Sequence, residues 1–242
     1  MTTKPKTIIV TGASQGIGAA VANLFLDRGY NVVGTSRNIS QKNELRRSDN
    51  LALVDGDIGL ASTAQTIVAA AVNRFGSVDG LVNNAGIFFP KPFTEYTPED
   101  FRKLSSTNLD GFICTTQLTV KQMLSQKTGG SVVSITTSLV DHPLAGYTAS
   151  VPMITKGGIN AISRSLAMEY AKQGIRVNVV APGIVDTPLH KDNPKDFLRT
   201  LSPLGQIAAS RDIAEAVLYL TEASQVTGEV LHVDGGAHLG RW

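Results

Sequence analysis

The sequence has one cysteine, no long apolar run and almost no net charge, and each of these absences excludes a class of protein. Cys114 alone cannot form an internal disulfide or a cluster of thiolate metal ligands. Its apolar neighbours, 111–113, favour a buried structural cysteine over a nucleophile. No apolar stretch approaches the ~20 residues of a membrane-spanning helix. The short polar start, residues 1–6, does not resemble a signal peptide, so we expect a cytoplasmic protein.

The charge balance argues against nucleic acid as a partner. The formal net charge of the 242 residues is +2, and the Lys and Arg residues are scattered along the chain. Hydrophobic residues at 42% and charged residues at 17% are typical of a folded globular protein. We therefore expect a small-molecule partner, with no nucleic acid, no membrane and no metal.

Short β-branched runs alternate with amphipathic segments, which predicts βαβ units and a parallel sheet covered on both faces. The expected strands are 7–10, 31–34, 51–54, 78–82, 131–135, 176–180 and 230–233, and the expected helices are 17–27, 62–75, 98–125, 153–172 and 211–221. The prediction is one Rossmann-like, doubly wound α/β domain over residues 1–242, with about seven strands.

The longest stretch without clear periodicity is 186–204, which contains three prolines and several charges. Long irregular segments in compact domains are uncommon and often functional, so a substrate lid is predicted here. The alternative is a surface excursion that contains a short helix.

A glycine-rich turn follows the first strand and opens a helix, with Gly12, Gly16 and Gly18 in the spacing Gly-x-x-x-Gly-x-Gly. Glycines allow the backbone to approach a pyrophosphate, whose charge is stabilised at a helix N-terminus. Between a strand and a helix, this turn predicts a dinucleotide cofactor.

The end of the second strand favours NADP over NAD. An acidic residue there would bind the ribose hydroxyls of NAD, but the chain has the neutral Ser36 followed by Arg37, whose guanidinium suits a 2′-phosphate. The alternative is an exposed arginine that opens a polar loop. Asp57 and Ile58, after the third strand, are expected near the adenine, although Asp57 would also suit a helix cap.

Further motifs give the chain a family resemblance. They are Asn83-Asn84-Ala85-Gly86, Asn108-Leu109-Asp110-Gly111, Ile175-Arg176-Val177-Asn178, Ala181-Pro182-Gly183 and Val233-Asp234-Gly235-Gly236. Together with the glycine turn, they cover nearly the whole chain in order, and the chain resembles a short-chain dehydrogenase/reductase.

The resemblance implies the roles of particular residues. Asn108 matches the asparagine that supports an active-site water chain through a helix distortion, and Lys156 matches the lysine that binds the nicotinamide ribose. The implied cofactor contacts are Gly12, Ser14, Gln15, Gly16, Ile17, Gly18, Asn84, Ala85, Gly86, Lys156, Pro182, Gly183, Ile184 and Thr187. The resemblance also implies a homotetramer or homodimer packed through two long helices.

The catalytic pattern departs from the family at one position. A Tyr-x-x-x-Lys pair is expected, but four residues before Lys156 stands Pro152. Proline suits the first turn of a helix, with Ser150 as the expected N-cap. The helix is therefore expected to form, with Lys156 still directed at the ribose, but without the family's acid.

Other candidates for the missing chemistry lie in the preceding loop. Ungapped alignment puts Thr137 at the family's serine position, with Ser138 as the next candidate. The segment from Thr137 to Lys156 is about two residues longer than usual, so Tyr147 is a possible substitute acid whose pKa a nearby ammonium would lower.

Three interpretations remain open. The first is an NADP-dependent carbonyl reductase or alcohol dehydrogenase in which Tyr147, or a water held by Asn108 and Lys156, supplies the proton. The second is a reductase of imines or activated alkenes, whose substrates need less help from an acid. The third is a non-catalytic dinucleotide-binding or scaffold protein. The first is preferred because Asn108 and Lys156 are both retained.

Overall fold

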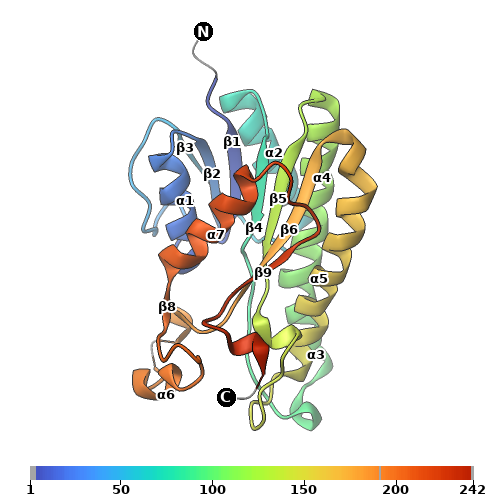
Figure 1. Ribbon diagram of the computed structural model, residues 1–242. Helices are drawn as coiled ribbons and strands as arrows, with labels where there is room; N and C mark the ends of the chain where they lie inside the picture. The colour runs from blue at the N-terminus through green and yellow to red at the C-terminus, as the bar shows by residue number, and fades with distance from the viewer. Residues whose placement is uncertain (1–3, 191, 241–242) are drawn as a thin grey trace.

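The computed structural model describes residues 4–190 and 192–240, so residue 191 of the expected lid and both extreme ends of the expected domain lie outside the described residues. Seven parallel strands form one twisted sheet in the order β3-β2-β1-β4-β5-β6-β9 (Figure 1). The strands are β1 (Thr7–Thr11), β2 (Asn31–Ser36), β3 (Leu51–Asp55), β4 (Gly80–Asn83), β5 (Gly130–Ile135), β6 (Ile175–Pro182) and β9 (Val230–Val233).

Both faces of the sheet are buried, because the strands carry apolar side chains on both sides. In β1, Ile8 and Val10 join the core beneath α1 (Gly16–Asp27) and α7 (Ser210–Glu222). Ile9 points to the opposite core, which is closed by α2 (Ala61–Phe75), α4 (Gly111–Gln126) and α5 (Ser150–Tyr170). Figure 1 shows α1 and α7 on one side of the sheet and the other three helices behind it. The predicted doubly wound α/β class is confirmed.

The predicted boundaries of the strands differ from the structure by two residues at three places, one of which is the end of β2 at Ser36 rather than at Gly34. β4 begins at Gly80 rather than at Val78, and β6 continues to Pro182, where it pairs with β9. The extension of β6 matters for the site because it carries the following Gly183 and Ile184 to the carboxyl edge of the sheet.

The segment 98–125 is helical throughout, as expected, but it is not one regular α-helix. It divides into α3 (Pro98–Ser105), a π-helical segment η2 (Ser106–Asp110) and α4. A π turn includes one extra residue, which hydrophobic periodicity does not reveal. The distortion buries the side chain of Asn108.

The start of α5 also differs from expectation. Ser150 is not the N-cap; it is the first helical residue, Ala149 takes the cap position, and no side chain caps the helix. Pro152 is the third helical residue, where the missing N–H would have had no partner within the helix. The proline is therefore compatible with an intact α5.

The segment 186–204 is more ordered than its sequence predicts. It contains the end of β7 (Val185–Asp186), a 3₁₀ turn η5 (Pro188–His190) and the short α6 (Lys195–Arg199). β7 pairs with β8 (Ala208–Ala209) in a small second sheet. The segment thus has the short helix of the alternative interpretation. Across residues 4–190 and 192–240, no helix has the length and apolar character that a membrane crossing requires.

Candidate active site

The candidate site lies where the strand order reverses between β1 and β4. Loops at the carboxyl ends of β1 to β6 surround a cavity of about 860 Å³. In open parallel sheets this crevice is the place where ligands bind. The helix N-terminus of α1 opens onto it through Gly16 to Gly18.

The glycine turn is tightly packed against the loop after β4. Gly12 has φ +65°, and a Cβ on Gly18 would lie 2.2 Å from the carbonyl oxygen of Gly12. The amide of Asn84 donates hydrogen bonds to the carbonyl oxygens of Thr11 and Gly12, at 2.9 and 3.1 Å. The hydroxyl of Thr11 accepts from the backbone N–H groups of Asn84 and Ala85. These contacts hold two cofactor-loop candidates, one after β1 and one after β4, in a single rigid arrangement.

The end of the cavity near β2 and β3 carries both signs of charge. Ser36 ends β2, Arg37 follows it, and both line the cavity, as Asp57 does after β3. The guanidinium of Arg37 is exposed to solvent. At the glycine turn, a carboxylate oxygen of the exposed Glu44 accepts from the backbone N–H of Gly16 at 3.3 Å. Arg37 would attract a 2′-phosphate at this end, and Glu44 would repel it.

Asp57 uses its side chain locally. One carboxylate oxygen accepts from the backbone N–H of Gly59 at 3.0 Å, while α2 begins only at Ala61 with Leu60 as its cap residue. Asp57 therefore shapes the turn after β3 and does not cap the helix, so the capping alternative is wrong.

Lys156 lies in the floor of the cavity and is buried. Its Nζ donates to the carbonyl oxygen of Ile135, at the end of β5, with a distance of 2.9 Å. Burial lowers the pKa of Lys156 from 10.5 to about 8, because the ammonium loses hydration. The hydrogen bond to Ile135 fixes the side chain at the carboxyl end of β5.

Asn108 connects the loop after β4 to the start of α5. Its side chain exchanges hydrogen bonds with the backbone of Ile87, accepting at 2.9 Å and donating at 3.1 Å. Its amide also donates to the hydroxyl of Thr155 at 3.0 Å, and that hydroxyl donates to the carbonyl oxygen of Pro152. Asn108 lies behind the main cavity, in a small void of about 10 Å³ that also touches Lys156. It positions the turn that carries Lys156.

Thr137 and Ser138 take different places after β5. Thr137 lines the cavity, and its hydroxyl accepts from the backbone N–H of Leu139 at 3.3 Å. Ser138 is buried and does not line the cavity. The geometry therefore favours Thr137 for contact with a bound molecule.

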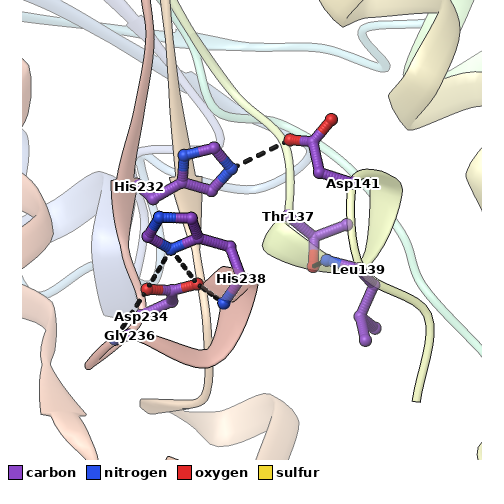
Figure 2. A network of polar contacts seen from close by, with 7 residues as sticks. All are labelled: Thr137, Leu139, Asp141, His232, Asp234, Gly236 and His238. Carbon is purple, nitrogen blue, oxygen red and sulfur yellow. Dashed lines mark hydrogen bonds and ion pairs between the residues drawn. The ribbon is translucent and has the colours of Figure 1, made fainter. Parts of the chain in front are cut away.

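The loop that follows Thr137 is tied to the C-terminal segment. A carboxylate oxygen of Asp141 lies 2.9 Å from Nε2 of His232 and accepts its proton-bearing N–H in the matching tautomer. The His232 ring stacks on His238 with centroids 4.0 Å apart (Figure 2). Nδ1 of His238 in turn contacts both carboxylate oxygens of Asp234. This network lies beside the site and fixes the backbone of the loop. Nowhere in the described parts of the chain do three His, Cys, Asp or Glu side chains form a metal site.

Tyr147 reaches the cavity from the lengthened loop, and its ring stacks on Phe88 with centroids 6.4 Å apart. Burial, and secondarily Tyr96, raise the pKa of Tyr147 above its usual value of 10.0. The expected lowering of this pKa by Lys156 is therefore wrong: the phenol is desolvated without a compensating positive charge.

The cavity collects nearly all the residues that the sequence nominated. Those that line it are Gly12, Ser14, Gln15, Gly16, Ile17, Gly18, Ser36, Arg37, Asp57, Ile58, Asn84, Ala85, Gly86, Thr137, Tyr147, Lys156, Pro182, Gly183, Ile184 and Thr187. Among the nominated residues, Asn108 and Ser138 do not line it.

Sequence reasoning missed the apolar wall of the cavity, formed by Phe88, Phe89, Leu139 and Leu189. It also left His190 unassigned, although this residue lines the cavity. The available signal was position: Phe88 and Phe89 follow the Asn83–Gly86 motif after one intervening residue, beyond the carboxyl end of a parallel strand. Leu189 and His190 lie in the segment already suspected as a lid.

The glycine turn at the mouth of this cavity has the arrangement expected of a dinucleotide site, and comparisons with known proteins identify the family. A family model described as "Enoyl-(Acyl carrier protein) reductase" matches residues 12–238. Carbonyl reductase family member 4 of Xenopus laevis is 39% identical over 236 residues, which cover 97% of this chain and 98% of that protein. The 3-oxoacyl-[acyl-carrier-protein] reductase of Bos taurus is 37% identical, with 97% and 98% covered.

Solved structures show the same arrangement. The 3-ketoacyl-(acyl-carrier-protein) reductase of Brucella melitensis, complexed with NADH, superposes with a TM-score of 0.87 at 28% identity, covering 96% of this chain and 98% of that one. ElxO with NADP bound gives a TM-score of 0.85 at 28% identity, with the same coverage. The chain belongs to the short-chain dehydrogenase/reductase family.

Proposed function

We propose that the protein is an NADP-dependent oxidoreductase that interconverts a small carbonyl compound and its alcohol without the family's tyrosine acid. The observation that carries this proposal is the convergence, in one cavity, of the glycine turn, Thr137 and a buried Lys156. The retained contacts of Asn108 support an active site over a scaffold, because they position the turn of α5 from which Lys156 projects.

The residues present fit a dinucleotide. Gly12 and Gly18 leave no room for a Cβ, which keeps the backbone close to the α1 N-terminus where a diphosphate is stabilised. Asp57 and Ile58 would hold the adenine, Lys156 the nicotinamide ribose, and Pro182 to Ile184 with Thr187 the nicotinamide. When bound, the nicotinamide supplies or accepts the hydride. Arg37 favours NADP over NAD.

The apolar wall indicates the kind of substrate. Phe88, Phe89, Leu139, Tyr147 and Leu189 surround the part of the cavity beyond Thr137. These side chains suit an uncharged substrate with an apolar or aromatic body. The hydroxyl of Thr137 would orient the carbonyl oxygen.

The two candidate proton sources are Tyr147 and a water held by Asn108 and Lys156. The raised pKa of Tyr147 weakens its phenol as an acid and favours a source on the Lys156 side. The proposal also includes a lid over 186–204, since Thr187 to His190 line the cavity, a homotetramer or homodimer built through the long helices α4 and α5, and a cytoplasmic location.

The test begins with cofactor binding and continues with turnover. Fluorescence titration should show tighter binding of NADPH than of NADH. Arg37→Ala should weaken NADPH binding about tenfold or more, because a hydrogen-bonded charge pair is lost, and should leave NADH binding nearly unchanged. Arg102→Ala is the matched control, since Arg102 pairs with Glu99 on the surface of α3.

A panel of ketones, imines and enones then separates the interpretations. Oxidation of NADPH by aromatic ketones supports the proposal. Oxidation by imines or enones alone would replace it with the second interpretation. Binding of NADPH without oxidation by any member of the panel would leave the non-catalytic one.

A further inference from the structure

Helix α5 has no acid at the position where the family has its catalytic tyrosine. One helical turn before Lys156 the chain has Pro152, whose side chain holds no ionisable hydrogen and is buried. The carbonyl oxygen of Pro152 is used by the hydroxyl of Thr155. We propose that the ammonium group of Lys156 is itself the acid that protonates the carbonyl oxygen of the substrate. This inference rests on the proposed reductase function.

The position of Nζ suits this role. An ammonium has three N–H donors, and one is used by the carbonyl oxygen of Ile135 at 2.9 Å. In the described part of the chain, no carboxylate lies within 4 Å of Nζ to hold the remaining protons as an ion pair. Nζ also lies beside Gly86, 3.2 Å from the place that a Cβ would occupy. Glycine at 86, which also lines the cavity, therefore leaves the space beside Nζ free of a side chain.

The acidity of Lys156 suits proton transfer near neutral pH. Loss of hydration brings its pKa to about 8, so the group is protonated at pH 7 and gives up the proton more readily than a solvated lysine. The other titratable groups that line the same cavity are Arg37, Asp57, Lys103, Tyr147 and His190.

The two nearest competitors are less suited to donate. Burial raises the pKa of Tyr147, which makes the phenol a weaker acid. Burial lowers the pKa of His190, partly opposed by Asp186, so the imidazole is largely without its second proton at neutral pH. Lys156 alone among these three is both protonated at pH 7 and moderately acidic.

The proton transfer from Lys156 accompanies the hydride transfer to the substrate. As the carbonyl carbon gains the hydride, the Nζ–H bond breaks and an O–H bond forms on the substrate oxygen. Lys156 becomes a neutral amine and recovers a proton from solvent after the alcohol leaves. In the reverse direction, the neutral amine removes the hydroxyl proton.

The first experiment measures the pH dependence of 2,2,2-trifluoroacetophenone reduction by NADPH. The value of kcat/KM should be constant at low pH and fall tenfold per pH unit above about pH 8, and the reverse reaction should rise through the same range. Tyr147→Phe should keep this break. A profile without a break near pH 8, or one whose break disappears in Tyr147→Phe, would overturn the proposal.

The second experiment separates acid catalysis from positioning. Lys156→Ala should lose about 10²–10⁴-fold in kcat, and added ethylamine, 2-fluoroethylamine and 2,2-difluoroethylamine should rescue it in order of increasing acidity of their ammonium ions. A purely positioning lysine would give rescue independent of that acidity, which contradicts the proposal.

A third readout does not depend on turnover. In protein labelled with ¹³C-lysine and saturated with NADP⁺, the NMR signal that disappears in Lys156→Met should titrate near pH 8. Titration above pH 10 would refute the acid role even if the reductase function holds. Titration near pH 8 with bound NADPH but no reduction of any carbonyl would instead refute the reductase function, and the acid role with it.

Discussion

Gly18→Ala tests the closeness of the glycine turn to the loop after β4. The new Cβ would lie 2.2 Å from the carbonyl oxygen of Gly12 and 2.5 Å from the amide nitrogen of Asn84. Backbone must move by about 1 Å to restore ordinary contact, and such overpacking costs ~1–3 kcal/mol. The hydrogen bond from Asn84 to Gly12 adds about 1 kcal/mol. Alanine recovers about 1 kcal/mol through its helix propensity, so a net loss of ~1–3 kcal/mol is expected.

The assay is thermal unfolding followed by circular dichroism, with NADPH titration in parallel. For a chain of this length, ~1–3 kcal/mol lowers Tm by roughly 2–12 °C. The displaced turn should also weaken NADPH binding at least tenfold. Gly158→Ala, within α5, is the control. Its Cβ would make only an ordinary 3.7 Å contact with Leu109 of η2, so this variant should raise Tm slightly. An unchanged Tm and NADPH affinity in Gly18→Ala would refute the argument.

Three further predictions concern charged residues at the site and Tyr147, which stacks on the apolar wall. Glu44→Gln should tighten NADPH binding a few-fold more than NADH binding, because it removes a negative charge beside Gly16; equal effects on both cofactors by titration would contradict this. Lys156→Met should stabilise the cofactor-free protein by roughly 3 kcal/mol below pH 8. The pKa of Lys156 falls from 10.5 to about 8 on folding, so the protonated lysine lowers the free energy of unfolding, and methionine removes that cost. That advantage should shrink between pH 8 and 10.5, where the unfolded chain alone holds the proton, and urea unfolding across this range measures it; an advantage independent of pH would count against it. Tyr147→Phe should change kcat by less than about threefold while Tyr147→Ala raises KM through the loss of the ring stacked on Phe88; a drop of ~10²-fold or more in Tyr147→Phe would restore the phenol as acid.

The sequence predicted the fold well because the relevant signals are local. Each strand of the sheet is an apolar run, and Ile8, Ile9 and Val10 are buried on alternating faces as such runs require. The spacing of Gly12, Gly16 and Gly18 likewise predicts the position of the glycine turn. Hydrophobic periodicity did not reveal the π-helical turn at Asn108, because one extra residue in a helix hardly changes the period; the family resemblance alone implied a helix distortion there.

The absence of the family's tyrosine was also visible in the sequence, since it requires only counting four residues back from Lys156 to Pro152. What replaces the missing tyrosine was not visible. Tyr147 is in the cavity, but its surroundings raise its pKa, and only the packed loop determines those surroundings. The predicted cap at Ser150 failed for a similar reason, because the path of the preceding loop sets where α5 begins.

By itself, the sequence determined that this chain is a doubly wound α/β domain with a glycine turn after its first strand, and with a lysine and no tyrosine at the expected catalytic spacing. These properties follow from periodicity and from residue order, which neighbouring residues fix. Only the tertiary structure decided that Lys156 is buried, with no carboxylate partner among the described residues, and that the apolar wall lines the same cavity. Hydration and electrostatic surroundings depend on groups brought together from distant parts of the chain, and so do the acidities that follow from them.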